Sequence, residues 1–276
     1  LIIILVFFSG ELVWRDRTSN IQEVINATPH STFASVLAKM SSLVVSVTLL
    51  QVIFIFMGIL SQIFRGYTAI ELDIYFIDFF VDTLPGYIVF AAIFVFIQTL
   101  TNNRYIGYFT GILFFITWEL IGGLIFEWRS NMLFPGGAPG IFYSYMSGFG
   151  PGMTGTLWFN LYWFLFAIIL LATAALLWPR SAVSGFKEKY KMAIANFSGS
   201  YRNGMIVLAA VWIAVGGWVF YNTQILNSYN SIADSEQLVV DYEFAYKKYE
   251  NHPLPVMKSI KYEIDIQPDD RDILVR

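Results

Sequence analysis

Several residue types that commonly build active sites are scarce in this chain of 276 residues. Cysteine is absent, and histidine occurs only as His30 and His252. The lack of cysteine excludes disulfides, iron–sulfur clusters, cysteine nucleophiles and thiolate zinc sites within this sequence. Neither histidine has a second strong ligand at metal-binding spacing. We therefore expect no catalytic residue, no metal site and no bound cofactor in this span.

Charge is scarce as well. Only 13% of the residues are charged, against about a quarter in soluble domains, and 57% are hydrophobic. The net charge of -3 provides no basic field for a polyanion. The composition excludes an ordinary soluble domain, argues against a nucleic-acid partner and indicates a protein that contacts the lipid bilayer.

The gaps between charges predict about six membrane-spanning helices. A helix of about 20 apolar residues crosses a hydrocarbon core of about 30 Å. The expected spans are a truncated first one at 1–8, followed by 40–64, 84–101, 105–126, 156–178 and 205–221. The chain begins at Leu1 rather than at methionine and stops at Arg276 inside an alternating pattern, so we interpret it as an internal piece of a longer polypeptide. The predicted fold is an all-α polytopic membrane bundle with a short external α+β segment.

Lysine and arginine predict the orientation, because short loops rich in these residues stay in the cytoplasm. Nine of the eleven basic residues before position 222 fall on one side when the spans alternate. They are Arg15, Arg17, Lys39, Arg104, Arg180, Lys187, Lys189, Lys191 and Arg202. This places the tail after Tyr221 outside, which is the periplasm if the membrane is a bacterial inner membrane.

The tail, residues 222–276, has a soluble composition. Apolar residues at helical spacing predict a helix at about 234–250. Alternation at 260–266 predicts a half-buried strand, and a turn at 267–270 leads to a partner strand from Ile273. Because one hairpin is not stable alone, we expect it to begin a larger β-domain.

The loop between the first two spans, residues 10–39, predicts a short helix. Ser19 followed by Gln22 is a capping-box pattern, and the helix ends near Ala27 before Pro29 starts the next one. Its narrow apolar stripe consists of Ile21, Val24 and Ile25. We expect an amphipathic helix at about 20–27 on the inner membrane surface. It either anchors the loop to lipid or docks a cytoplasmic partner.

This loop resembles the coupling-helix region of type-2 ABC transporter permeases. The matching positions are Gly10, Glu11, Ala27, Thr28, Pro29, Ser35 and Lys39. The resemblance covers residues 1–178 and implies docking of a cytoplasmic ABC ATPase subunit, together with a second permease half or a homodimer partner. The docking residues it implies are Glu11, Arg15, Arg17, Ile21, Glu23, Ile25 and Pro29. Since the chain has no GxxxxGK[ST] motif, ATP belongs to the partner subunit.

A charge-free stretch rich in glycine and aromatic residues, 130–155, precedes the fifth span. We expect a pair of broken half-helices at about 132–152, packed on protein in the outer leaflet. The permease family has half-helices at this place, near the outer exit of its substrate path. The alternative is an ordinary outer loop.

Three acidic residues lie within or near the predicted spans and are candidates for a substrate or ion path. Glu119 falls inside a span, where an ionisable group is costly unless it faces the bundle or water. It either binds a polar substrate or ion, or bonds to a neighbouring helix through Trp158 or Tyr162. Asp78 and Asp82 lie one helical turn apart on a predicted interfacial helix, as a solvated acidic face or as a cation site.

A basic cytoplasmic loop at 179–204 and the extra span at 205–221 lead into the tail. Its junction is similar to that of bacterial proteins in which a type-2 permease is fused to a gluzincin zinc aminopeptidase. The resemblance implies zinc in a downstream domain, held by a His-Glu-x-x-His helix that this span lacks. The alternative is a generic external adaptor domain.

Three functions remain open from the sequence. The preferred one is a permease subunit of an ATP-driven type-2 ABC transporter in the bacterial inner membrane, fused to an external aminopeptidase-like domain. The second is a membrane-anchored zinc aminopeptidase whose permease-like part is only a scaffold. The third is an ion-coupled carrier in which Glu119, Asp78 and Asp82 are the coupling residues.

Overall fold

The computed structural model describes most of the chain, in two compact units. The described residues are 1–28, 31–101, 103–122, 130–150, 152–178, 185–227, 232–253, 257–267 and 272–275. Unit 1 is Leu1–Tyr229 and unit 2 is Asn230–Arg276.

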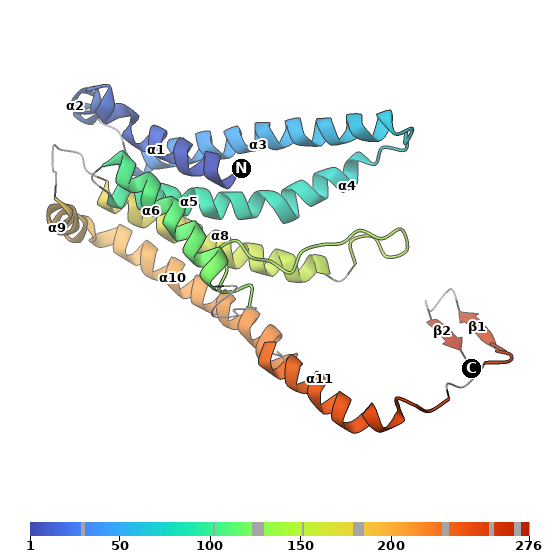
Figure 1. Cartoon of the computed structure of the whole chain (residues 1–276). Helices are drawn as coiled ribbons and strands as arrows, with labels where there is room; N and C mark the ends of the chain where they lie inside the picture. Colours follow the sequence, from blue (N-terminus) through green and yellow to red (C-terminus); the bar gives the residue numbers. More distant parts are fainter. Residues whose placement is uncertain are drawn as a thin grey trace. The chain divides into compact units, whose positions relative to one another are not determined.

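Unit 1 consists of helices, with a long non-helical loop before α8 (Figure 1). The α-helices are α1 (Ile2–Thr18), α2 (Gln22–Ala27), α3 (Thr32–Phe64), α4 (Leu72–Ile77), α5 (Leu84–Leu100), α6 (Arg104–Ile116), α8 (Gly152–Leu177), α9 (Phe186–Asn196) and α10 (Gly199–Phe220). Three π-helical turns extend them: η1 (Asp78–Thr83), η2 (Thr117–Ile121) and η3 (Tyr221–Leu226).

Four continuous helices in the described residues are long and apolar enough to cross a membrane. They are Thr32–Phe64, Leu72–Leu100, Gly152–Leu177 and Gly199–Leu226. Their length and composition identify a membrane protein with an all-helical bundle. α6 is a shorter apolar helix of 13 residues that η2 continues.

The core of the bundle is α5. Its residues from Val89 to Val95 are all buried, and α1, α3, α6 and α8 pack around it. A helix that is apolar on every side can be enclosed in this way, whereas α3 leaves most of its apolar side chains outside the packed core. α10 packs on α8 through stacked rings, with 5.4 Å between the centroids of Tyr162 and Trp212.

A proline explains the irregular segment before α5. Pro85 has no N–H, so it cannot donate a hydrogen bond to the carbonyl of Val81, four residues earlier. The Val81 carbonyl instead accepts a hydrogen bond of 2.6 Å from Nδ2 of Asn160 on α8. The widened turn η1 lies immediately before this proline, and α4, η1 and α5 continue as one long helix. Asp78 and Asp82 therefore belong to a membrane-length helix that begins at Leu72, rather than to a separate interfacial one.

Several boundaries differ from the sequence-based expectation. α1 continues through Gly10 to Thr18, so Glu11, Arg15 and Arg17 lie on this helix and not in a loop. Arg17 stacks on Trp14 of the same helix, with 4.4 Å from the guanidinium carbon to the ring centroid. The basic segment 179–204 contains α9, and α10 begins at Gly199, six residues before the predicted extra span.

Residues 130–150 form turns and extended backbone, with one antiparallel bridge between Ser144 and Gly148. This corrects the expectation of half-helices at 132–152. The physical reason is the backbone conformation: Gly136 and Gly140 have φ of 71° and 78°, a left-handed region that breaks a helix. Pro135 and Pro139 further interrupt helical hydrogen bonding.

Unit 2 contains α11 (Ile232–Tyr246), a 3₁₀ turn η4 (Lys247–Tyr249) and the strands β1 (Ile264–Gln267) and β2 (Asp272–Val275). The strands pair antiparallel, with Ile264 opposite Val275. This hairpin lies where alternating residues predicted one, although β1 is shorter than the expected strand. A larger β-domain is not seen within the described residues.

Candidate docking site

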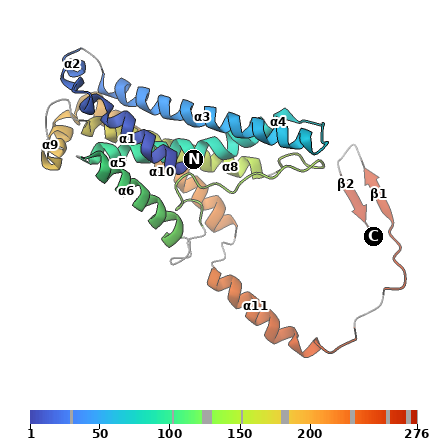
Figure 2. The ribbon, with the colours of Figure 1, turned by 45° about the horizontal axis from the view of Figure 1, so that its top comes forward.

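The helix ends that carry most of the basic residues gather at one end of unit 1 (Figures 1 and 2). This end comprises the end of α1, α2, the start of α3, the end of α5, the start of α6, the end of α8, α9 and the start of α10. We call it the α2 end. Arg17, Lys39, Arg104 and Lys189, which the orientation rule assigned to one side, all lie here.

α2 is a single short helix that connects α1 to α3. Asn20 has φ of 54°, and this left-handed backbone conformation separates α1 from α2. The N-cap is Ile21 and not Ser19, since the backbone N–H of Ser19 closes α1 on the carbonyls of Arg15 and Arg17. The expected capping box at Ser19 is therefore not formed.

Apolar side chains are exposed at α2 and its N-cap. Ile21 is 45% exposed and Val24 is 69% exposed, whereas Ile25 is half-buried. Among the other predicted docking residues, Glu23 lies on α2 but its side chain is outside the described part of the structure, and Pro29 is outside the described residues. Arg15 and Glu11 are exposed on α1.

An ion pair fastens the base of α3 to α1 beside α2. Lys39 Nζ lies 2.8 Å from Asp16 Oδ2, and the two side chains are only 15% and 26% exposed. The same ammonium donates a 2.6 Å hydrogen bond to the carbonyl of Leu12. Because this pair is shielded from water, it holds α1 and α3 together more firmly than a surface ion pair would.

A polar cluster joins α1 to α5 and α6. Gln98, which is fully buried on α5, accepts a 3.1 Å hydrogen bond from Trp14 Nε1. Gly107 of α6 lies so close to the Gln98 amide that a methyl group there would overlap it. At the edge of the cluster, Tyr108 donates a 3.0 Å hydrogen bond to Glu11 Oε1, and Arg104 lies 3.6 Å from the same oxygen.

α9 contributes a buried lysine to this end. Lys189 is 1% exposed, and its Nζ donates to the carbonyls of Thr99, Leu100 and Thr101 at 2.9, 3.4 and 3.1 Å. These carbonyls close α5 and have no partner within the helix, so the ammonium caps it. Burial, with a further effect of the Arg17 charge, lowers the pKa of Lys189 to about 8, and the cationic form prevails at neutral pH.

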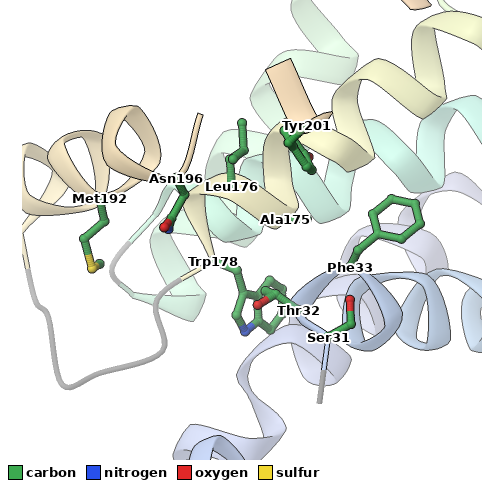
Figure 3. A pocket seen from close by; sticks show the side chains of 9 residues that line it. All are labelled: Ser31, Thr32, Phe33, Ala175, Leu176, Trp178, Met192, Asn196 and Tyr201. Carbon is green, nitrogen blue, oxygen red and sulfur yellow. The ribbon is translucent and has the colours of Figure 1, made fainter. Parts of the chain in front are cut away.

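A cavity of about 430 Å³ opens between α3, α8, α9 and α10 (Figure 3). Its lining mixes aromatic and hydroxyl side chains and includes Phe33, Trp178 and Tyr201. The Tyr201 hydroxyl donates a 2.6 Å hydrogen bond to the carbonyl of Ala172, so it is anchored to α8.

The predicted acidic candidates lie at the opposite end of unit 1. The Asp82 carboxylate accepts a backbone hydrogen bond from Ile141, and Thr156 Oγ1 donates to the carbonyl of Gly140 at 3.3 Å. Asp82 is thus a contact for the loop 130–150, and Asp78 beside it is exposed. Glu119 lies in η2, and its side chain is outside the described part of the structure.

The loop also reaches the turn after α3. The Tyr145 hydroxyl lies 3.5 Å from both the Tyr67 hydroxyl and Glu71 Oε2. The hydrogen bond with Tyr67 and the charge of Glu71 raise the pKa of Tyr145 to about 12.

Sequence reasoning missed Lys189 and Gln98. A single glutamine inside the apolar run 84–98 was a visible signal, because a buried amide needs a partner. Lys189 gave no such signal, since it alternates with Lys187 and Lys191, which are exposed. Among the described residues, no group of three or more His, Asp or Glu side chains is placed to hold a metal ion.

The site is therefore a surface built from helix ends, with exposed apolar side chains at α2 beside polar contacts that join α1 to α3 and α5. Comparison with protein-family models, curated proteins and solved structures gives no match.

Proposed function

We propose that this chain is the carboxy-terminal half of the membrane subunit of an ATP-driven type-2 ABC transporter in a bacterial inner membrane. In this proposal α1 and α6 are the two further spans besides the four long apolar helices, and a second permease half or a second copy completes the bundle. The α2 end faces the cytoplasm, and unit 2 begins an external aminopeptidase-like domain. ATP is bound by the partner subunit, and zinc by the domain downstream.

The observation that carries the proposal is the pair of exposed apolar side chains at α2 together with the ion pair that joins the two helices flanking it. Ile21 and Val24 are available to a partner, while Lys39 connects α3 to Asp16 and Leu12 of α1 beside α2. A coupling helix needs both properties. It must present a surface to the ATPase, and it must be joined to the helices that the ATPase moves.

The contacts of α1 with α3 and α5 also define how a displacement of α2 would reach the other helices. A displacement of α2 acts first on the ends of α1 and α3. From α1 it passes to the central helix α5 through the hydrogen bond between Trp14 and Gln98. Because packed interfaces shift between discrete arrangements rather than deform continuously, such a displacement would rock whole helices.

The 276 residues contain no cysteine, so a thiol introduced among them is unique within this part of the protein. Val24→Cys is prepared in the full-length protein, with any cysteine outside these residues replaced by serine, and is labelled with a photoactivatable maleimide. We expect light to link it to a protein that contains a GxxxxGK[ST] phosphate loop. The matched control is Met146→Cys, another exposed apolar residue, at the opposite end of unit 1. A linked partner without a nucleotide-binding motif, or links to lipid alone, would contradict the proposal.

A separate test addresses the fusion. If unit 2 begins a gluzincin domain, the polypeptide after Arg276 contains His-Glu-x-x-His, and the purified full-length protein binds about one zinc ion. A different downstream domain would remove the aminopeptidase part and leave the transporter part intact.

A further inference from the structure

α9 has a surface that the proposed docking of an ATPase at α2 does not use. It connects α8 to α10, two helices of membrane-spanning length, and runs across their direction (Figures 1 and 2). Its packed side carries the buried Lys189 and Ala193. Because α8 and α10 both have membrane-spanning length, we expect the helix that connects the end of one to the start of the other to lie at the membrane surface.

The rest of α9 divides into an apolar stripe and a basic stripe. Tyr190 and Ile194 are 56% and 57% exposed, and Phe197 follows at the same helical spacing. Lys187 and Lys191 are exposed along the adjacent stripe. This order of packed, apolar and basic faces around one helix is typical of helices that lie in the membrane interface.

We propose that α9 binds the headgroups of anionic phospholipids, with its apolar stripe inserted at the level of the upper acyl chains. Two lysines beside the stripe match negative headgroup charge, and their aliphatic stems allow the ammonium groups to reach it. A protein partner is the less favoured occupant, since both ends of α9 are fixed at the bilayer by α8 and α10. The lipid surface is therefore the nearest apolar medium.

Such binding would act on the core of the bundle. Lys189, on the opposite face of α9, donates to the three carbonyls that end α5. The position of α9 on the lipid surface therefore fixes the position of the end of the central helix. This effect does not depend on an ATPase partner.

The test uses the full chain with a single introduced thiol. Ile194→Cys is labelled with an environment-sensitive dye, and the protein is placed in phosphatidylcholine vesicles with about 20 mol % phosphatidylglycerol. Brominated phosphatidylglycerol is expected to quench the dye more per mole than brominated phosphatidylcholine. Ala195→Cys, exposed on another side of α9, is the matched control and is expected to remain accessible to a quencher in water.

Charge variants then separate headgroup recognition from simple burial. Lys187→Gln and Lys191→Gln should each lower the preference for phosphatidylglycerol about fivefold, and the corresponding arginine variants should retain it. Equal quenching by both lipids, or no quenching by either, would overturn the proposal. Since the vesicles contain no ATPase, failure here leaves the transporter proposal unaffected.

Discussion

The two ends of the helical unit are built by different kinds of contact. At the α2 end, charged and amide side chains are buried between helices: Lys189 caps α5, Lys39 joins α3 to α1, and Gln98 bonds to Trp14. At the opposite end, the loop 130–150 is attached mainly through backbone groups, such as those of Ile141 and Gly140. Its tip is open, and Met146 is 99% exposed.

The difference in contacts predicts which end of the bundle deforms more easily. Buried ionic contacts lose much free energy when one partner is displaced, so helices joined by them move as a unit. A loop held by a few backbone hydrogen bonds can change its shape at a small free-energy cost. We therefore expect the α2 end to be the stiffer of the two, and substitutions can test that ranking.

The largest effect should come from Lys189→Met. It removes the donor for three carbonyls in a buried position and should lower the free energy of unfolding by about 3 kcal/mol. Lys191→Met, on the same helix but exposed, should change it by about 0.5 kcal/mol or less. The apparent melting temperature of the two variants measures the difference. Equal shifts would show that Lys189 does not cap α5.

The pH dependence of the same pair has a definite sign. Lys189 has a pKa of about 8 in the fold and about 10.5 when unfolded, so the unfolded chain binds more protons between these values. The contribution of Lys189 to the free energy of unfolding therefore rises with pH across that window. The gap in melting temperature between the native protein and Lys189→Met should widen from pH 8 to pH 10.5. A constant gap would place the pKa of Lys189 near its ordinary value.

Gly107→Ala tests the contact between α5 and α6. The added methyl group overlaps the buried Gln98 amide, which its bond to Trp14 holds in place. Overpacking of this kind should cost about 2 kcal/mol. Gly58→Ala on α3 is the control, since its methyl group meets no atom within 4 Å and should be neutral or slightly stabilising. If Gly107→Ala is as neutral as Gly58→Ala, the cluster is looser than its contacts indicate.

The sequence predicted the helices better than it predicted their ends. Sparse charge located all of the long apolar helices, because length and hydropathy alone decide which segments can enter a bilayer. Charge was a poor guide to helix termini. α1 continues through Glu11, Arg15 and Arg17, since Lys39 and Arg104 neutralise the acids beside them and the helix passes beyond the apolar region.

The contacts of the candidate site could not be predicted, for a different reason. A buried lysine on α9 and a glutamine on α5 acquire their roles from partners 84 to 90 residues away in the chain. The residues next to Lys189 and Gln98 in the sequence do not indicate a partner that is so distant in the chain. The same holds for Asn160. Its role as a donor becomes clear only in the structure, because Pro85 of the neighbouring helix leaves the Val81 carbonyl without its usual N–H donor.

Asn160→Leu should destabilise the protein by about 1 to 2 kcal/mol, because the Val81 carbonyl loses its donor inside a membrane-length helix. Pro85→Ala restores an N–H four residues after Val81 and should recover part of that loss in the double variant. A double-mutant cycle of melting temperatures measures the coupling. Purely additive effects would show that the proline does not create the need for Asn160.

The smallest changes in stability are expected from removing one tyrosine hydroxyl at each end of the bundle. They compare the two ends most directly. Tyr108→Phe deletes a 3.0 Å hydrogen bond to the charged Glu11 and should cost about 1 kcal/mol, because a charged acceptor strengthens the bond. Tyr145→Phe deletes two contacts of 3.5 Å on an exposed loop and should change stability by less than about 0.5 kcal/mol. Both changes remove the same atom, so the difference in melting temperature reports the environment alone. A larger loss at Tyr145 would reverse the ranking and make the loop, rather than the α2 end, the stiffer part of the bundle.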